Sequence, residues 1–126
     1  MIHGTTNHSL FNLPVNGEFN EMDGPSLRAK QEEFKNVECI VLDEYACTSK
    51  QMLGRMDRRC RQFMVCDEFF GGLTVIMVGD PAQLPPVGGS QMFTTSTERP
   101  GELGGLAAYR EFKKVHLLSG HLRLTR

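Results

Sequence analysis

Two apolar runs of this 126-residue chain end in acidic residues, and these ends are where the sequence could do chemistry. The run 39–42 is followed at once by Asp43 and Glu44, and the run 73–78 is followed after one residue by Asp80. Magnesium in proteins takes hard oxygen ligands and is often held by one or two carboxylates together with substrate phosphates. Asp43 and Glu44 are therefore a predicted metal site, in which Glu44 would also act as general base on an attacking water.

A neutral amide follows the second acidic end, within the Pro- and Gly-rich loop 81–90. Gln83 could touch the terminal phosphate of a nucleotide and orient water without adding a repulsive charge. A plainer interpretation stays open, in which the acids are solvated loop residues and Gln83 belongs to a surface turn. The matching ends of the two runs favour the site over that interpretation.

The elements that must position these residues alternate between strand and helix. The two apolar runs predict strands that are buried on both faces, as in a parallel sheet. Between them, apolar residues at helical spacing predict a helix over 48–66 that Thr48 or Ser49 caps. Because active groups gather at the carboxyl ends of parallel strands, the two acidic ends should share one site.

The remaining segments complete an α/β pattern. A charged helix is predicted over 26–36 with Ser26 as its N-cap, and a loop over 94–105. A short helix over 106–114 and a third strand over 115–118 would follow. Strand and helix in alternation predict an α/β domain with a parallel sheet.

Composition narrows the class of protein further. With 40% hydrophobic and 23% charged residues, the chain has the content of one ordinary globular domain. Its net charge of −1 gives no bulk basic field, so any nucleic-acid contact must be local. No apolar run approaches the roughly 20 residues of a membrane helix. Four cysteines without a CxxC pair predict reduced thiols in a cytoplasmic or nuclear protein, with a mitochondrial location also open.

Four segments form a family pattern when they are taken in chain order. Thr5–Phe11 reads TTNHSLF, Ile40–Glu44 reads IVLDE, and Phe70–Val87 reads FGGLTVIMVGDPAQLPPV, the most specific of the four. The shorter segment Leu117–Arg123 comes last. Together they resemble superfamily-one DNA helicases of the Pif/RecD type: a segment along the single-stranded DNA path, the Walker B strand, motif III, and a segment whose arginine reaches the γ-phosphate.

The resemblance implies a RecA-like (P-loop NTPase) fold and an ATP-dependent DNA helicase that hydrolyses ATP with Mg²⁺ while moving on single-stranded DNA, as in repair or recombination. It carries roles onto matching positions: catalysis for Glu44, Gln83 and Arg123; nucleotide binding for Asp43, Asp80 and Gln83; metal binding for Asp43 and Glu44; and DNA binding for Thr6, His8 and Ser9. Phe11 could stack on a base, but a place in the core is the favoured expectation.

Two departures from the family pattern limit these expectations. Tyr45 and Ala46 follow the acidic pair, where the family usually has a small aliphatic residue and then Ser. No G-x-x-x-x-G-K-[ST] phosphate-binding loop occurs in the sequence. Residues 1–126 are therefore expected to be part of a RecA-like motor domain, truncated at the N-terminus, a gene fragment or a decayed copy. Alone, the chain should bind ATP poorly and should not unwind DNA.

Other functions remain as alternatives. A non-catalytic nucleic-acid-binding or interaction module could keep the motor scaffold without its nucleotide chemistry. An unrelated Mg²⁺-dependent ATPase or nuclease would need a nucleotide-binding loop or further acids on neighbouring strands, and the sequence shows neither. The basic residues of the central helix could track phosphates, although a solvated helix face is the favoured interpretation. They are Arg55, Arg58, Arg59 and Arg61.

Overall fold

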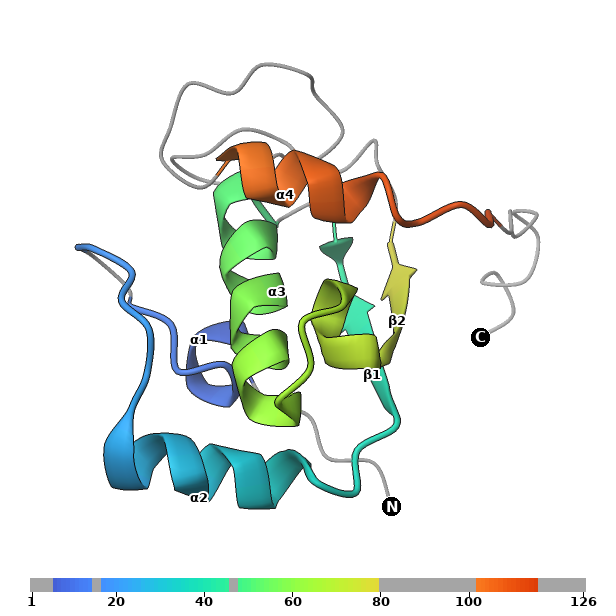
Figure 1. Ribbon diagram of the computed structural model, residues 1–126. Helices are drawn as coiled ribbons and strands as arrows, with labels where there is room; N and C mark the ends of the chain where they lie inside the picture. Colours follow the sequence, from blue (N-terminus) through green and yellow to red (C-terminus); the bar gives the residue numbers. More distant parts are fainter. Residues whose placement is uncertain (1–5, 15–16, 46–47, 80–101, 116–126) are drawn as a thin grey trace, which may run out of the picture.

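The computed structural model describes residues 6–14, 17–45, 48–79 and 102–115. The elements within these ranges are, in chain order, α1 (Asn7–Leu10), α2 (Gly24–Phe34), β1 (Cys39–Asp43), α3 (Lys50–Met64), the short 3-10 helix η2 (Phe69–Gly72), β2 (Thr74–Val78) and α4 (Glu102–Tyr109). Helix α3 lies at the centre, with α4 crossing near its start and α2 near its end (Figure 1).

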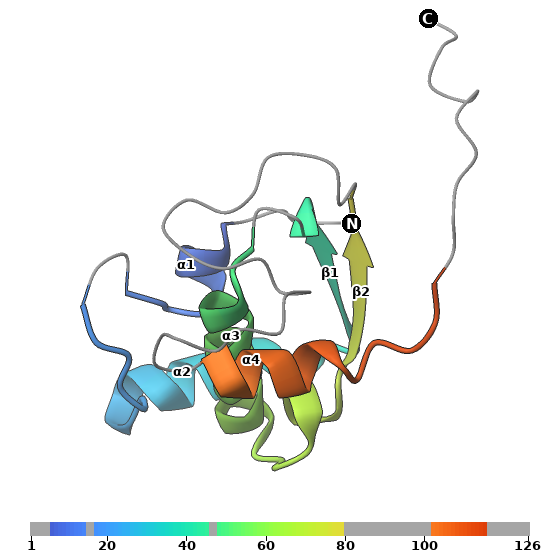
Figure 2. The same ribbon diagram turned by 90° about the horizontal axis from the view of Figure 1, so that it is seen from above.

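Strands β1 and β2 form a parallel pair, which confirms the predicted α/β class (Figure 2). Their register runs from Cys39 opposite Thr74 to Asp43 opposite Val78. Both strands begin and end within one residue of their predicted bounds. The predicted third strand, 115–118, lies outside the described residues except for Val115, which is 80% exposed and not in a strand.

The prediction that both strands are buried on both faces is wrong for the described part of the chain. Ile40 and Leu42 of β1 are buried, but Val41 between them is 62% exposed. In β2 the exposed positions are Ile76 at 48% and Val78 at 44%. The reason is that the described helices pack on one face of the pair, the face that carries Ile40 and Leu42.

Helix α3 confirms the helix predicted over 48–66 and contributes more core residues than any other described element. The Ser49 side chain caps it by accepting a hydrogen bond from the backbone N–H of Met52 at 3.1 Å. It ends at Val65, whose φ of 50° reverses the chain. One stripe of the helix is buried, as its apolar spacing requires. The stripe contains Leu53, Met56, Cys60 and Phe63.

Helix α2 begins two residues before its predicted start, and Ser26 is not its cap. Asp23 holds the N-cap position, and the Ser26 hydroxyl instead donates to the Asp23 carbonyl oxygen at 3.1 Å. The last residue of the helix, Phe34, packs its ring 4.8 Å from Phe63 and 6.4 Å from Phe11. Phe11 is only 1% exposed, so its favoured place in the core is confirmed.

Helix α4 begins at Glu102, inside the stretch predicted as a loop. The prediction was wrong there because tertiary packing, not propensity, forms its first turn. Gly105 lies so close to α3 that an added Cβ would come 2.6 Å from the carbonyl carbon of Lys50. None of the helices in the described ranges is long and apolar enough to cross a membrane.

Candidate functional site

The carboxyl ends of β1 and β2 meet, as the acidic ends of the two runs predicted. Asp43 is the last residue of β1 and lies opposite Val78. One residue further, a Cβ on Gly79 would lie 3.2 Å from the Cα of Glu44 and 3.1 Å from the backbone nitrogen of Tyr45. The segments that follow β1 and β2 therefore touch through their backbones where the strands end. Only glycine fits at position 79 without displacing its neighbours.

Glu44 turns the chain sharply after β1. Its φ is 53°, in the left-handed region that residues other than glycine seldom adopt. Its backbone N–H donates to Oδ1 of Asp43 at 2.8 Å, and this bond closes the turn. Such a conformation persists only where the surrounding structure holds it, and it is commonest at functional sites.

The donor set at this turn consists of two exposed carboxylates. Oδ1 of Asp43 is engaged by the next amide, and among the described residues Oδ2 has no hydrogen-bond partner. The described ranges hold no group of three or more His, Cys, Asp or Glu side chains that could form a closed metal cage. A pair of this kind suits Mg²⁺, which keeps waters and completes its shell with substrate phosphates.

The other residues predicted for this site are not described. Asp80 directly follows the contact at Gly79, and Gln83 follows three residues later, but both lie outside the described residues. The same holds for Arg123. The structure thus brings Asp43 and Glu44 to the end of β2, and it leaves the places of Asp80, Gln83 and Arg123 as predictions.

The three predicted DNA-binding residues lie together in and beside α1. Thr6 is its N-cap, and its hydroxyl oxygen accepts a hydrogen bond from the Ser9 N–H at 3.3 Å. Thr6 and Ser9 are exposed, whereas His8 is half-buried. Within the described part of the chain, Nδ1 of His8 is buried without a hydrogen-bond partner.

Two cations tie the end of α1 to the helices beside it. Nζ of Lys30 in α2 donates to the carbonyl oxygens of Leu10 at 2.8 Å and Ser9 at 3.4 Å. Arg59 in α3 donates to the carbonyl oxygens of the two residues after the helix, Phe11 at 3.0 Å and Asn12 at 3.1 Å. The short α1 therefore does not depend on its own single turn for its position.

The favoured interpretation of the α3 arginines as one solvated face is wrong for Arg59. That side chain is 3% exposed, and burial lowers the pKa of its guanidinium. Only Arg58 is fully on the surface, in an ion pair with Glu21. A signal for Arg59 was present in the sequence, because it stands three residues after Met56 and four before Phe63, which are both in the buried stripe.

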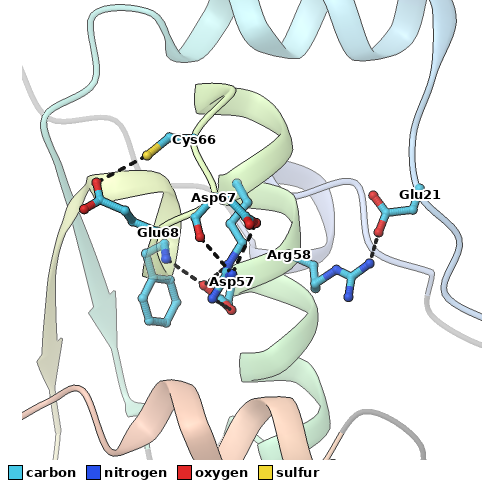
Figure 3. A network of polar contacts seen from close by, with 8 residues as sticks. Glu21, Asp57, Arg58, Cys66, Asp67 and Glu68 are labelled. Carbon is cyan, nitrogen blue, oxygen red and sulfur yellow. Dashed lines mark hydrogen bonds and ion pairs between the residues drawn. The ribbon is translucent and has the colours of Figure 1, made fainter.

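A second polar network joins α3 to η2, the turn that leads into β2 (Figure 3). Asp57 is buried, and its Oδ1 accepts from the backbone N–H of Phe70 at 2.6 Å. Its Oδ2 pairs with Arg61 at 3.1 Å, and Arg61 also reaches Asp67. Burial lowers the pKa of Arg61, but hydrogen bonds and charge from Asp57 and then Asp67 outweigh that effect and raise it.

This network fixes an unusual backbone at the start of motif III. Phe70 and Gly71 have φ values of 53° and 62° inside η2. A Cβ on Gly71 would lie 2.9 Å from the carbonyl carbon of Cys60 and 2.9 Å from Cβ of Met64, so the turn can press on α3 only with glycine there. The turn that leads into β2 is therefore packed directly on α3.

Comparison with known proteins agrees with this arrangement. The family model for "PIF1-like helicase" matches residues 1–100. The chain is 28% identical over 90 residues to the ATP-dependent DNA helicase Pif1 of Psychrobacter sp. (strain PRwf-1), covering 69% of this chain and 14% of that protein. It is 30% identical over 81 residues to the ATP-dependent DNA helicase PIF3 of Trypanosoma brucei brucei (strain 927/4 GUTat10.1), covering 64% of this chain and 10% of that protein.

Solved structures give the same result. The crystal structure of Bacteroides sp. Pif1 in complex with ADP-AlF4 is similar with a TM-score of 0.56 and 37% identity, covering 67% of this chain and 20% of that one. The structure of Bacteroides Pif1 bound to ssDNA has a TM-score of 0.52 and 32% identity, over the same shares. The present chain thus spans a small part of the proteins it matches, and its strands belong to their RecA-like fold. On the match over residues 1–100, this chain belongs to the PIF1-like helicase family.

Proposed function

We propose that the chain is part of the first motor domain of an ATP-dependent DNA helicase, which couples ATP hydrolysis to movement along single-stranded DNA. The observation that carries this proposal is the contact between the two strand ends. Asp43 pairs with Val78, and the backbone of Glu44 lies against Gly79. Gly79 directly precedes Asp80 in the sequence. A nucleotide site at this edge would receive groups from both strands, as open parallel sheets do.

Each residue has a distinct role in the proposal. The Asp43 carboxylate, whose Oδ2 has no hydrogen-bond partner among the described residues, would hold Mg²⁺, and Glu44 would help to hold it. Bound there, Mg²⁺ would neutralise charge on the nucleotide phosphates. Glu44 would accept a proton from the attacking water. Gln83 and Arg123 would contact the γ-phosphate, and Asp80 would support the nucleotide.

A second part of the proposal concerns single-stranded DNA. The hydroxyls of Thr6 and Ser9 are exposed on one short helix and are of the kind that contacts phosphate oxygens. His8, whose Nδ1 has no hydrogen-bond partner in the described part of the chain, would add a ring contact. Similar proteins support both parts, because Bacteroides Pif1 has been solved with ADP-AlF4 and with ssDNA.

The test is a Glu44→Gln substitution in a longer protein that carries this chain together with a phosphate-binding loop. We expect ATP binding to remain and hydrolysis to fall by a factor of about 100 or more, the usual contribution of a general base. The matched control is Glu38→Gln, an exposed acid just before β1 begins. Normal hydrolysis by the Glu44 variant would overturn the base assignment. DNA binding without any hydrolysis by the unmodified protein would favour the non-catalytic alternative.

A further inference from the structure

Arg59 is a charged side chain inside the fold, and the nucleotide chemistry above gives it no role. It is 3% exposed, although the preceding residue of the same helix, Arg58, is exposed. Its guanidinium lies 4.3 Å from the centre of the Phe19 ring, so one face of the plane is covered by an aromatic side chain. Burying an arginine is unfavourable unless its donors are satisfied. Its acceptors therefore indicate what it is for.

Three of those acceptors are backbone carbonyl oxygens from a distant part of the chain. Nε donates to Phe11 at 3.0 Å, Nη2 to Asn12 at 3.1 Å and Nη1 to Asn20 at 2.8 Å. A fourth bond joins Nη1 to Oε1 of Gln62 at 3.2 Å. The planar fork of arginine can satisfy several fixed carbonyls at once, which the single ammonium of lysine cannot do.

Arg59 clamps the backbone through these carbonyls, and two of the clamped residues, Phe11 and Asn12, directly follow α1, the segment with the proposed DNA contacts. Phe11 is the C-cap of α1, whose body contains His8 and Ser9 and whose N-cap is Thr6. Asn12 has a φ of 52°, so the chain reverses where Arg59 holds it. The clamp thus fixes both the end of α1 and the direction in which the chain leaves it.

The same arginine belongs to the helix that follows the proposed catalytic turn. Helix α3 begins at Lys50, six residues after Glu44, and is continuous as far as Met64. Arg59 is ten residues into it, about 14 Å along the axis from its first residue. One continuous helix therefore starts six residues after Glu44 and carries Arg59 to the backbone at the end of α1.

We propose that Arg59 is a positioning residue for single-stranded DNA binding. It holds the backbone at Phe11 and Asn12 so that Thr6, His8 and Ser9 are presented to the strand, and it joins that segment to α3. This inference rests on the proposed DNA contact by α1. In this proposal Arg59 itself touches no DNA, because its side chain is buried and its guanidinium already makes four hydrogen bonds within the fold.

The experiment compares Arg59→Met and Arg59→Lys with the control Arg58→Met in the 126-residue chain. Arg58 is the next residue, carries the same charge and lies on the surface. Affinity for fluorescein-labelled oligo(dT) is measured by anisotropy at several salt concentrations. Hydrogen exchange is followed at the amides of Leu10, Phe11 and Leu13, which bond to Thr6, Asn7 and His8.

We expect Arg59→Met to weaken binding about fivefold, the scale of a residue that acts through others. The slope of affinity against salt should stay unchanged, because no phosphate contact is lost. The three amides should exchange faster. Arg59→Lys should recover part of both effects. If Arg59→Met does not fold, Phe19→Leu removes the ring against the guanidinium and keeps all four hydrogen bonds, and it should shift both readings in the same direction.

Three results would overturn the inference. The first is a folded Arg59 variant that has a lower melting temperature but binds oligo(dT) with unchanged affinity. The second is an equal loss in Arg58→Met, which would assign the effect to charge. The third is a reduced slope of oligo(dT) affinity against salt concentration in Arg59→Met, which would indicate that Arg59 contacts a DNA phosphate directly. By contrast, no oligo(dT) binding by the unmodified chain would overturn the proposed DNA contact of α1 itself, while faster exchange in Arg59→Met would still establish the clamp.

Discussion

The Cα of Glu44 lies 3.2 Å from the point where a side chain on Gly79 would begin. This contact brings the carboxyl ends of β1 and β2 together at backbone distance. At the same point Glu44 has a φ of 53°, in the left-handed region.

The backbone of Glu44 leads to a first prediction. Glu44→Gly should raise the free energy of unfolding by about 1 kcal/mol, since glycine adopts a positive φ without strain. Val41→Gly is the control, an exposed position in the extended strand before the turn, and should lower the free energy of unfolding. Urea unfolding followed by circular dichroism measures both. Destabilisation by Glu44→Gly would contradict the assigned strain.

The packing of α4 on α3 gives a second prediction with a control in the next residue. Gly105→Ala would push a methyl group into the Lys50 backbone and should lower the free energy of unfolding by about 1–3 kcal/mol. Gly104→Ala meets nothing within 4 Å and should stabilise the helix by about 0.5–1 kcal/mol. Thermal unfolding of the two variants should therefore shift in opposite directions, and a shared direction would refute the close approach.

A third prediction concerns Asp57, which holds the turn before β2. Asp57→Ala leaves Arg61 without its buried partner and Phe70 without an acceptor for its N–H, so a loss of about 3 kcal/mol is expected. Asp67→Ala removes a fully exposed partner of the same arginine and should leave unfolding unchanged. Hydrogen exchange at the Phe70 amide, which should become faster in Asp57→Ala, tests the loss of this bond directly. An unchanged exchange rate in Asp57→Ala would show that another group holds the turn.

Thiol chemistry gives a fourth prediction. Burial, and then the negative charge of Asp57, raise the pKa of Cys60 to about 12. Because the thiolate is the reactive form, iodoacetamide at pH 8 should modify exposed Cys39 and spare Cys60 in the folded chain. Peptide mass spectrometry gives the result, with urea-unfolded chain as the control in which both react. Equal labelling of both cysteines in the folded chain would contradict the burial of Cys60.

The raised pKa of Cys60 also gives the direction of a pH dependence. A thiol that ionises later in the folded state than in the unfolded state keeps its full contribution to stability below its ordinary pKa of 9.0. That contribution is lost as the pH rises from 9.0 toward about 12. Replacing Cys60 with Ala should flatten the fall in stability over this range, measured against the parent chain.

The elements that carry the strand ends could be predicted from the sequence because their signals are local. An apolar run ending at Asp43 needs no partner to be recognised, and the spacing of Met56, Cys60 and Phe63 defines α3 by itself. The N-cap at Ser49 follows from hydroxyl chemistry alone. These local signals were sufficient for β1, α3 and β2 in their order and for the position of the acidic pair, but not for α1 or η2.

What the sequence could not supply depends on contacts between distant residues. Arginine is usually exposed, and nothing near Arg59 announces carbonyl acceptors 39 to 48 positions away. Gly104 and Gly105 carry little helix preference, so the start of α4 depends on its fit against α3. Glu44 and Phe70 adopt positive φ without the Gly or Asn that would mark such a turn.

The uneven burial of β1 and β2 has a practical consequence for anyone producing this chain. Val41, Ile76 and Val78 are open to water, while Ile40 and Leu42 on the reverse side hold the core. Threonine keeps the β-branched shape that strands favour and reduces the exposed apolar surface of the outer face. Replacing the three outer residues with threonine should therefore increase the yield of soluble recombinant material without touching the inner side.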